Sequence, residues 1–148
     1  MEPGSAELRL RWRTTPEIAR DANTVGVTVF GGDRADDDVL AQRAAANRDT
    51  LAAGTGGVVV AYFGGAPVAL AGIRLAGGVA RLWGGAVLEA YRGRGVYRAL
   101  VAGRLSYAAE RGATMALTRG RVTTSSPILR RVGFVSYGRE RTYRLPLT

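Results

Sequence analysis

The chain has 148 residues and contains no lysine, histidine or cysteine; its 21 arginines and 12 acidic residues give a formal net charge of +9. This length suits a single domain over residues 1–148, with a core that needs no disulfide or metal support. The composition excludes thiol nucleophiles, histidine bases, Ser/His/Asp triads and the common zinc ligand sets, so no metal is expected. Carboxylates, hydroxyls, guanidinium groups and backbone amides are left to carry any chemistry.

The charge is unevenly distributed along the chain. Residues 1–89 hold nine arginines and ten acids, whereas residues 90–148 hold twelve arginines and two acids. The nucleotide composition of a GC-rich genome would explain the missing lysine, but not this asymmetry. The basic second half is therefore where an anionic ligand would be attracted.

The start of the chain, residues 1–10, lacks the apolar run of a signal peptide, and no apolar stretch reaches the length of a membrane span. We expect a cytoplasmic protein without a membrane partner. The absence of cysteine is compatible with that compartment.

The first third of the chain predicts one strand and two helices. Residues 7–13 alternate apolar and charged side chains, which is typical of a half-buried strand. Thr15 and Pro16 mark a helix start, and the helix would end at Gly31-Gly32. Alternating valines at 25, 27 and 29 also fit a strand, but we favour the helix. A second helix would follow residues 33–38 and end at Gly54, with a buried side of Val39, Leu40, Ala44 and Leu51.

The remainder predicts a sheet with two further helices. Strands over residues 58–63 and 67–75 form a hairpin, and a third strand covers residues 79–88. A long helix then runs from residue 96 to Gly112, and residues 114–118 form a short strand. Ser125 would cap a short helix that ends near residues 132–133. Two closing strands are expected over residues 134–137 and 142–147, and no linker or repeat divides the chain.

The turn over residues 91–98 is the most informative motif. It joins an apolar strand to a helix, and Gly93 and Gly95 permit a sharp bend and a close approach to a ligand. The first helix amides, the helix dipole and nearby arginines would converge on one anion. A dinucleotide fingerprint fails for want of a third glycine and a later acid, and a P-loop fails for want of Gly-Lys-Ser/Thr. A phosphate-binding turn is favoured over a plain surface loop.

Two segments resemble the GCN5-related N-acetyltransferase (GNAT) superfamily. Residues 92–97 (RGRGVY) are similar to its Arg/Gln-x-x-Gly-x-Gly/Ala signature, and residues 125–134 resemble its short helix before a Gly-Phe pair. The resemblance covers about residues 58–147. It implies an α/β (α+β) fold with a single GNAT-like domain, in which about four helices flank a mixed, mostly antiparallel sheet of six to seven strands.

The resemblance also implies acetyl-CoA as co-substrate. The turn amides, at Arg92, Gly93, Arg94, Gly95, Val96 and Tyr97, would hold its pyrophosphate, and the side chains of Arg94 and Arg98 would reach outer phosphate oxygens. The preceding strand residues Ala86, Val87 and Leu88 would line the thioester, and an amide near Val87 would stabilise the oxyanion. Gly84-Gly85 suits the strand distortion found beside this element in the family.

Three departures from the family pattern leave the catalytic residues unknown. Tyr97 replaces a small residue, so its side chain must point away from the phosphates or stack on the cofactor. Leu129 replaces the tyrosine acid of many members, and residues 79–88 contain no carboxylate. Glu89 and Ser125 are the candidates, although a solvated acid and a helix cap explain them more simply. The thiolate would leave unassisted or take its proton from another tyrosine.

The favoured function is N-acetyl transfer to a primary amine by direct attack in a ternary complex. The alternative is a GNAT-fold, CoA-binding sensor with little catalytic activity, since the usual acid and base are missing. The acceptor would be an amine-bearing small molecule or peptide. By analogy with the family, the protein would form a homodimer. Nucleic acid is a less favoured partner because aromatics are not interleaved with the arginines. The acidic run, Asp33, Asp36, Asp37 and Asp38, fits either a helix start or a site for a cationic amine.

Overall fold

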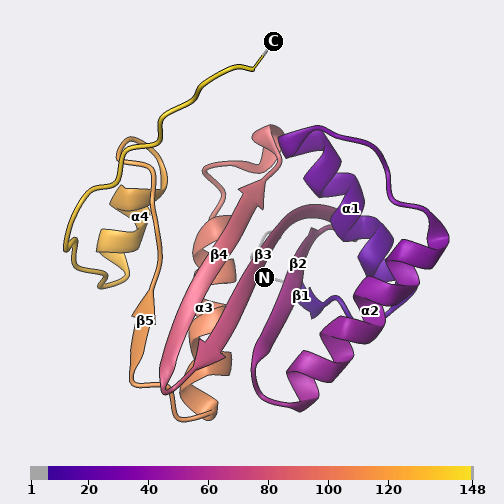
Figure 1. Ribbon diagram of the computed structural model, residues 1–148, viewed down its shortest axis with the longest axis horizontal. Helices are drawn as coiled ribbons and strands as arrows, with labels where there is room; N and C mark the ends of the chain where they lie inside the picture. Colours follow the sequence, from indigo (N-terminus) through magenta and orange to yellow (C-terminus); the bar gives the residue numbers. More distant parts are fainter. Residues whose placement is uncertain (1–6, 148) are drawn as a thin grey trace.

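The computed structural model describes residues 7–147, and its centre is a five-stranded sheet in the order β1-β2-β3-β4-β5 (Figure 1). The first four strands pair antiparallel, and β5 runs parallel to β4. Their bounds are β1 Leu8–Trp12, β2 Gly56–Phe63, β3 Ala66–Ala76, β4 Val79–Val87 and β5 Met115–Leu117. The expected α+β fold with a mixed, mostly antiparallel sheet is confirmed, but the sheet has five strands within residues 7–147, where six to seven were expected.

The helices lie on both sides of this sheet. Helices α1 (Pro16–Phe30) and α2 (Asp37–Ala52) cover one face, and α3 (Val96–Glu110) covers the other, while the short α4 (Ser125–Arg131) lies beside β5 (Figure 1). The helix predicted from Thr15 is confirmed, because the Thr15 hydroxyl accepts a hydrogen bond from the Ile18 amide at 3.2 Å. That bond satisfies one of the amides left free at a helix start.

The apolar residues form a core on each face of the sheet. On the α3 face, Ala69, Ala71, Val96 and Leu100 are buried together. On the opposite face, Ala22 of α1 packs with Val60 and Tyr62 of β2. The alternation of these positions along β2 and β3 explains why both strands are buried on both sides.

Strand β4 contains a bulge and then separates from β5. Gly84 and Gly85 together oppose the single residue Ala71 of β3, and Gly84 has a φ of +66°. Strand β5 pairs with β4 over only three residues, at Val79, Ala80 and Arg81. The second half of β4 therefore has no strand partner on its β5 side, which leaves its edge open.

The C-terminal part differs from the sequence prediction. Residues 134–137 and 142–147 form no strand. Phe134 packs partly buried against the core, whereas the apolar side chains after it stay in solvent, with Tyr137 95% and Tyr143 85% exposed. Alternation alone does not make a strand, because its backbone groups need a neighbouring edge. In Figure 1 this tail runs away from the sheet beyond α4.

The predicted cap of α4 is also wrong. Ser125 is the first residue of α4 and its hydroxyl accepts a hydrogen bond from the Arg121 amide at 2.8 Å, upstream of the helix instead of within its first turn. The cap position belongs to Thr124, whose side chain makes no capping bond. Within residues 7–147, no helix is both long and apolar enough to cross a membrane. Residues 1–6, part of the segment in which no signal peptide was expected, lie outside the described residues.

Candidate active site

The turn between β4 and α3 presents free backbone amides. Gly93 and Gly95 have φ angles of +75° and +80°, and Gly95 is the N-cap of α3 without a side-chain capping bond. The first backbone hydrogen bond of the helix runs from the Ala99 amide to the Gly95 carbonyl at 3.0 Å. The amides of residues 96–98 therefore have no partner within the helix and point out of its positive end.

The space in front of this turn is open. A Cβ built on Gly93 or on Gly95 would meet no other atom within 4 Å. Val96 and Leu100 anchor the helix in the core, whereas residues 92–95 are exposed. A helix start that is anchored in the core and exposes its backbone amide donors is suited to binding a phosphate group.

The open edge of β4 leads directly to this turn. The Leu88 amide donates to the Val68 carbonyl of β3 at 2.8 Å. Because backbone groups along a strand alternate between its two edges, the Val87 amide faces the open side. The Val87 carbonyl points to the same open side, because its hydrogen-bond donor is Arg92 Nε, at 3.1 Å, and not a backbone amide of β3. A ligand that starts at the turn can thus continue along β4 through backbone hydrogen bonds.

The three arginines of the turn have different surroundings. The Arg92 side chain donates its Nε hydrogen bond to the Val87 carbonyl at the end of β4. The Arg94 guanidinium lies over two rings that contact each other, 5.5 Å from the centroid of Tyr91 and 5.9 Å from that of Phe63. Arg98 is exposed on the first turn of α3. Arg94 and Arg98 thus remain the side chains free to reach an anion at the turn.

The side chain of Tyr97 points away from the phosphate side. Its Cε1 atom lies 2.9 Å from the position that a Cβ on Gly85 would occupy, so the ring covers the β4 bulge. One of the two outcomes expected for this bulky residue is therefore observed. The absence of a side chain at Gly85 is what admits the ring.

The catalytic candidates lie apart from one another. Glu89 is exposed in the short 3-10 helix Glu89–Tyr91, two residues beyond the Val87 amide. Ser125 lies on α4 and is engaged by Arg121, as described above. Leu129 is 5% exposed, with its Cδ1 2.8 Å from the position of a Cβ on Gly120. The structure therefore brings Glu89, but not Ser125, next to the turn in sequence and space.

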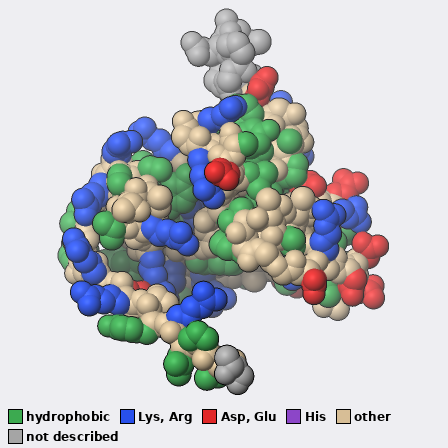
Figure 2. Space-filling view, turned by 90° about the horizontal axis from the view of Figure 1, so that it is seen from above, with side chains coloured by type: hydrophobic (Ala, Val, Ile, Leu, Met, Phe, Trp, Pro, Cys, Tyr) green, Lys and Arg blue, Asp and Glu red, His purple; other side chains and the backbone are tan. Residues whose placement is uncertain are grey.

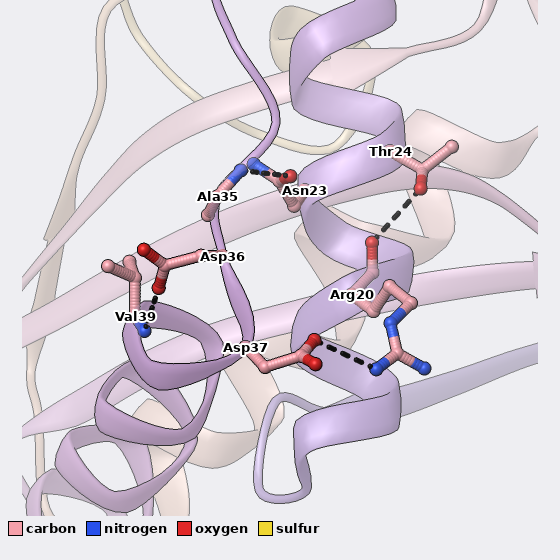
Figure 3. Close-up of polar contacts among 7 residues, drawn as sticks. All are labelled: Arg20, Asn23, Thr24, Ala35, Asp36, Asp37 and Val39. Carbon is pink, nitrogen blue, oxygen red and sulfur yellow. Dashed lines mark hydrogen bonds and ion pairs between the residues drawn. The ribbon is translucent and has the colours of Figure 1, made fainter.

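The acidic run at the start of α2 is largely engaged in local structure (Figure 3). The Asp36 carboxylate accepts a hydrogen bond from the Val39 amide at 2.9 Å and caps α2, which agrees with the interpretation of this run as the start of a helix. Asp37 forms an ion pair with Arg20 of α1 at 3.3 Å. Asp33 and Asp38 are exposed. Only these two acids are left for a cationic ligand.

The surface separates the charges (Figure 2). Arginines gather on the side of α4 and the C-terminal segment, and acidic side chains gather on the opposite side, over α1 and α2. The cavities near the far end of α3, which share Arg111 as a lining residue, contain none of the predicted site residues. The site is instead the exposed strand edge and helix start.

Two helices on one face of a mixed sheet, one on the other, and a glycine turn between a splayed strand and a helix define an α+β acyltransferase fold. The sequence model of the acetyltransferase (GNAT) family matches residues 13–134, and the chain belongs to this family. It is an acetyl-CoA-dependent N-acetyltransferase, with acetyl-CoA as co-substrate. This assignment favours the transferase over the sensor. No curated protein matches the sequence.

Solved structures share this fold at low sequence identity. The aminoglycoside N-acetyltransferase AAC(6')-Iy, bound to a bisubstrate analogue made from CoA and acetylneamine, is 20% identical, with a TM-score of 0.70 over 95% of this chain and 99% of that one. An acetyltransferase of Trypanosoma brucei is 19% identical, with a TM-score of 0.73 and coverages of 95% and 100%. Glucosamine-6-phosphate N-acetyltransferase of Arabidopsis thaliana is 11% identical, with a TM-score of 0.75 and coverages of 94% and 99%.

Proposed function

We propose that the protein transfers the acetyl group of acetyl-CoA to a primary amine, which attacks the thioester directly in a ternary complex. The observation that carries this proposal is the continuity between the free amides of residues 96–98 and the open β4 edge at Val87. The amides would hold the pyrophosphate, with Arg94 and Arg98 on outer oxygens. Charge-assisted hydrogen bonds of this kind contribute about 1.5 to 3 kcal/mol each.

Bound acetyl-CoA supplies an electrophilic thioester carbon. The chain orients that carbon along β4 and offers the Val87 amide to the oxygen on which negative charge develops. Holding the amine within about 3 to 3.5 Å of the carbon supplies much of the rate by proximity. The amine loses its proton to water, or to Glu89, whose carboxylate is exposed two residues beyond Val87.

The acceptor is proposed to be an amine-bearing small molecule. Several proteins of the same fold are aminoglycoside acetyltransferases, and one acts on an amino sugar phosphate according to its name. The exposed Asp33, between α1 and α2, and Asp38, in the first turn of α2, would attract a cationic amine. A peptide amine is the second candidate that the same chemistry permits.

Two measurements test this function. Acetyl-CoA at a hundredfold excess over its dissociation constant should stabilise the protein by about 2.7 kcal/mol, seen as a rise in melting temperature. Turnover of an aminoglycoside, an amino sugar and a short peptide is then followed by a thiol reagent, which meets no background because the protein has no cysteine. No thermal shift at millimolar acetyl-CoA would contradict the cofactor site, and a shift without turnover of any amine would favour the sensor.

A further inference from the structure

A buried arginine lies beneath the proposed reaction site. Arg104 of α3 is only 2% exposed, and its guanidinium donates to the carbonyls of Gly72 at 2.9 Å and Trp83 at 3.4 Å. Its Nε donates to the Leu100 carbonyl at 3.0 Å. Among residues 7–147, no carboxylate pairs with it. A buried cation that binds only neutral carbonyls retains most of its positive potential for a further group nearby.

Tyr97 is the ionisable group that faces this cation. The two residues are separated by seven positions on α3, which places them on the same side of the helix. The Tyr97 ring rests on Gly85 at the bulge, and the Arg104 guanidinium donates to the carbonyl of Trp83, the residue directly before the bulge. Gly84 and Gly85 are both exposed, so a ligand that follows the β4 edge passes beside this ring.

We propose that Tyr97 donates the proton that the CoA thiolate takes up as it leaves, while the Arg104 cation at the same Gly84–Gly85 bulge stabilises the phenolate that results. This inference rests on the proposed function, because it requires the thioester to lie along the open edge between Gly85 and Val87. It assigns the acid role that Leu129 cannot fill.

The electrostatics of the pair suit an acid. Burial raises the pKa of Tyr97, and the positive charge of Arg104 opposes part of that rise. The phenol is therefore protonated at neutral pH, and its phenolate forms next to a cation instead of in an apolar pocket. Burial in turn lowers the pKa of Arg104 to about 10, which still leaves the guanidinium charged at neutral pH.

The proton balance closes within one turnover. The amine nitrogen forms a bond to the acetyl carbon, and the carbon–sulfur bond breaks with its electron pair on sulfur. The sulfur takes the Tyr97 proton and leaves as the CoA thiol. The proton released by the acylated nitrogen returns through water to the phenolate, which restores the phenol.

The test uses Tyr97→Phe, which keeps the ring on Gly85 and removes only the hydroxyl. We expect kcat to fall on the order of 100-fold, as for loss of a general acid, with little change in KM for acetyl-CoA. The pKa of the bound CoA thiol, titrated by the absorbance of its thiolate, gives a readout independent of turnover. Without the donor, the acid dissociation constant of the bound thiol should fall about tenfold relative to wild type, because a hydrogen bond to the thiolate favours its charged form.

Two controls keep the result interpretable. Tyr137→Phe removes a hydroxyl from a residue 95% exposed in the C-terminal segment and should change neither readout. The thermal shift with acetyl-CoA should be the same in wild type and Tyr97→Phe. A kcat within twofold of wild type, together with an unchanged thiol pKa, would overturn the role of Tyr97 while leaving cofactor binding intact. Loss of the thermal shift in wild type itself would overturn the proposed function instead.

Discussion

Replacement of Gly95 by alanine tests the cofactor turn most directly. Gly95 has a φ of +80°, a conformation that disfavours any residue with a Cβ by about 1 to 2 kcal/mol. No protein atom lies within 4 Å of the new methyl group, so the folded state gains no clash. The methyl group would instead occupy the space into which the phosphates must come. We therefore expect a modest loss of stability and a larger loss of binding.

The magnitude follows from the amides at the helix start. Displacing the pyrophosphate from one charge-assisted hydrogen bond costs about 2 kcal/mol, which weakens binding about 30-fold. At an acetyl-CoA concentration of about one hundred times the wild-type dissociation constant, the stabilisation falls from about 2.7 to about 0.9 kcal/mol. At about 4 °C per kcal/mol, the melting shift would fall from about 11 °C to about 4 °C.

Gly112, just beyond the other end of the same helix, provides a matched control. It follows the C-terminal end of α3 with a φ of +79°, and a Cβ there also meets nothing within 4 Å. Gly112→Ala should thus cost the same stability without cofactor but keep the full acetyl-CoA shift. Both variants are compared by thermal unfolding with and without acetyl-CoA. An equal shift in the two variants would refute the assignment of the turn.

Two further predictions concern the stability of the fold. The Tyr62 hydroxyl donates to Asp21 at 2.6 Å, and burial, followed by this hydrogen bond, raises the pKa of Tyr62. Tyr62→Phe should lower the free energy of unfolding by about 1.5 kcal/mol at pH 8. The unfolded tyrosine ionises near pH 10, whereas the folded tyrosine ionises only at a higher pH, so the stability difference between wild type and variant should shrink as the pH rises past 10. Urea titrations at several pH values measure this difference, and a difference that stays constant would contradict the stabilising role of the Tyr62 hydrogen bond. Asp36→Ala should cost about 1 kcal/mol by removing the cap of α2, whereas Asp38→Ala, at an exposed position, should stay within about 0.5 kcal/mol in the same urea assay. Equal losses in the two aspartate variants would exclude the capping role.

The conformation of the turn between β4 and α3, and most of the elements, could be predicted from the sequence because their causes are local. Gly93 and Gly95 have the positive φ angles that only a glycine adopts freely, and Thr15 and Asp36 cap their helices through neighbouring amides. The bulge at Gly84-Gly85 agrees with the strand distortion that the family resemblance implied and that these two glycines suit. These features depend on a few consecutive residues, so an inspection of the chain reveals them.

The predictions that were wrong depend on contacts with parts of the chain that are distant in sequence. The alternation in residues 142–147 predicted a strand, but a strand needs a partner edge that no local pattern supplies. Ser125 has the side chain of a helix cap, yet its hydroxyl turns to the Arg121 amide instead. The sequence left two directions possible for the Tyr97 side chain, because its contact with the bulge depends on how α3 packs on β4. Arg104 was missed, although its spacing from Leu100 and Ala108 along the buried side of α3 could have drawn attention to it.

The open edge of β4 also bears on how the free protein behaves at high concentration. Unpaired strand edges are templates for strand addition by another chain, and proteins commonly protect them with bulges. The Gly84-Gly85 bulge bends only part of this edge, while Val87 continues with its amide directed outward. Acetyl-CoA lying along β4 would cover the same hydrogen-bonding groups. The co-substrate would then also act as a solubility factor, so that depletion of acetyl-CoA exposes the enzyme to self-association as well as stopping its reaction.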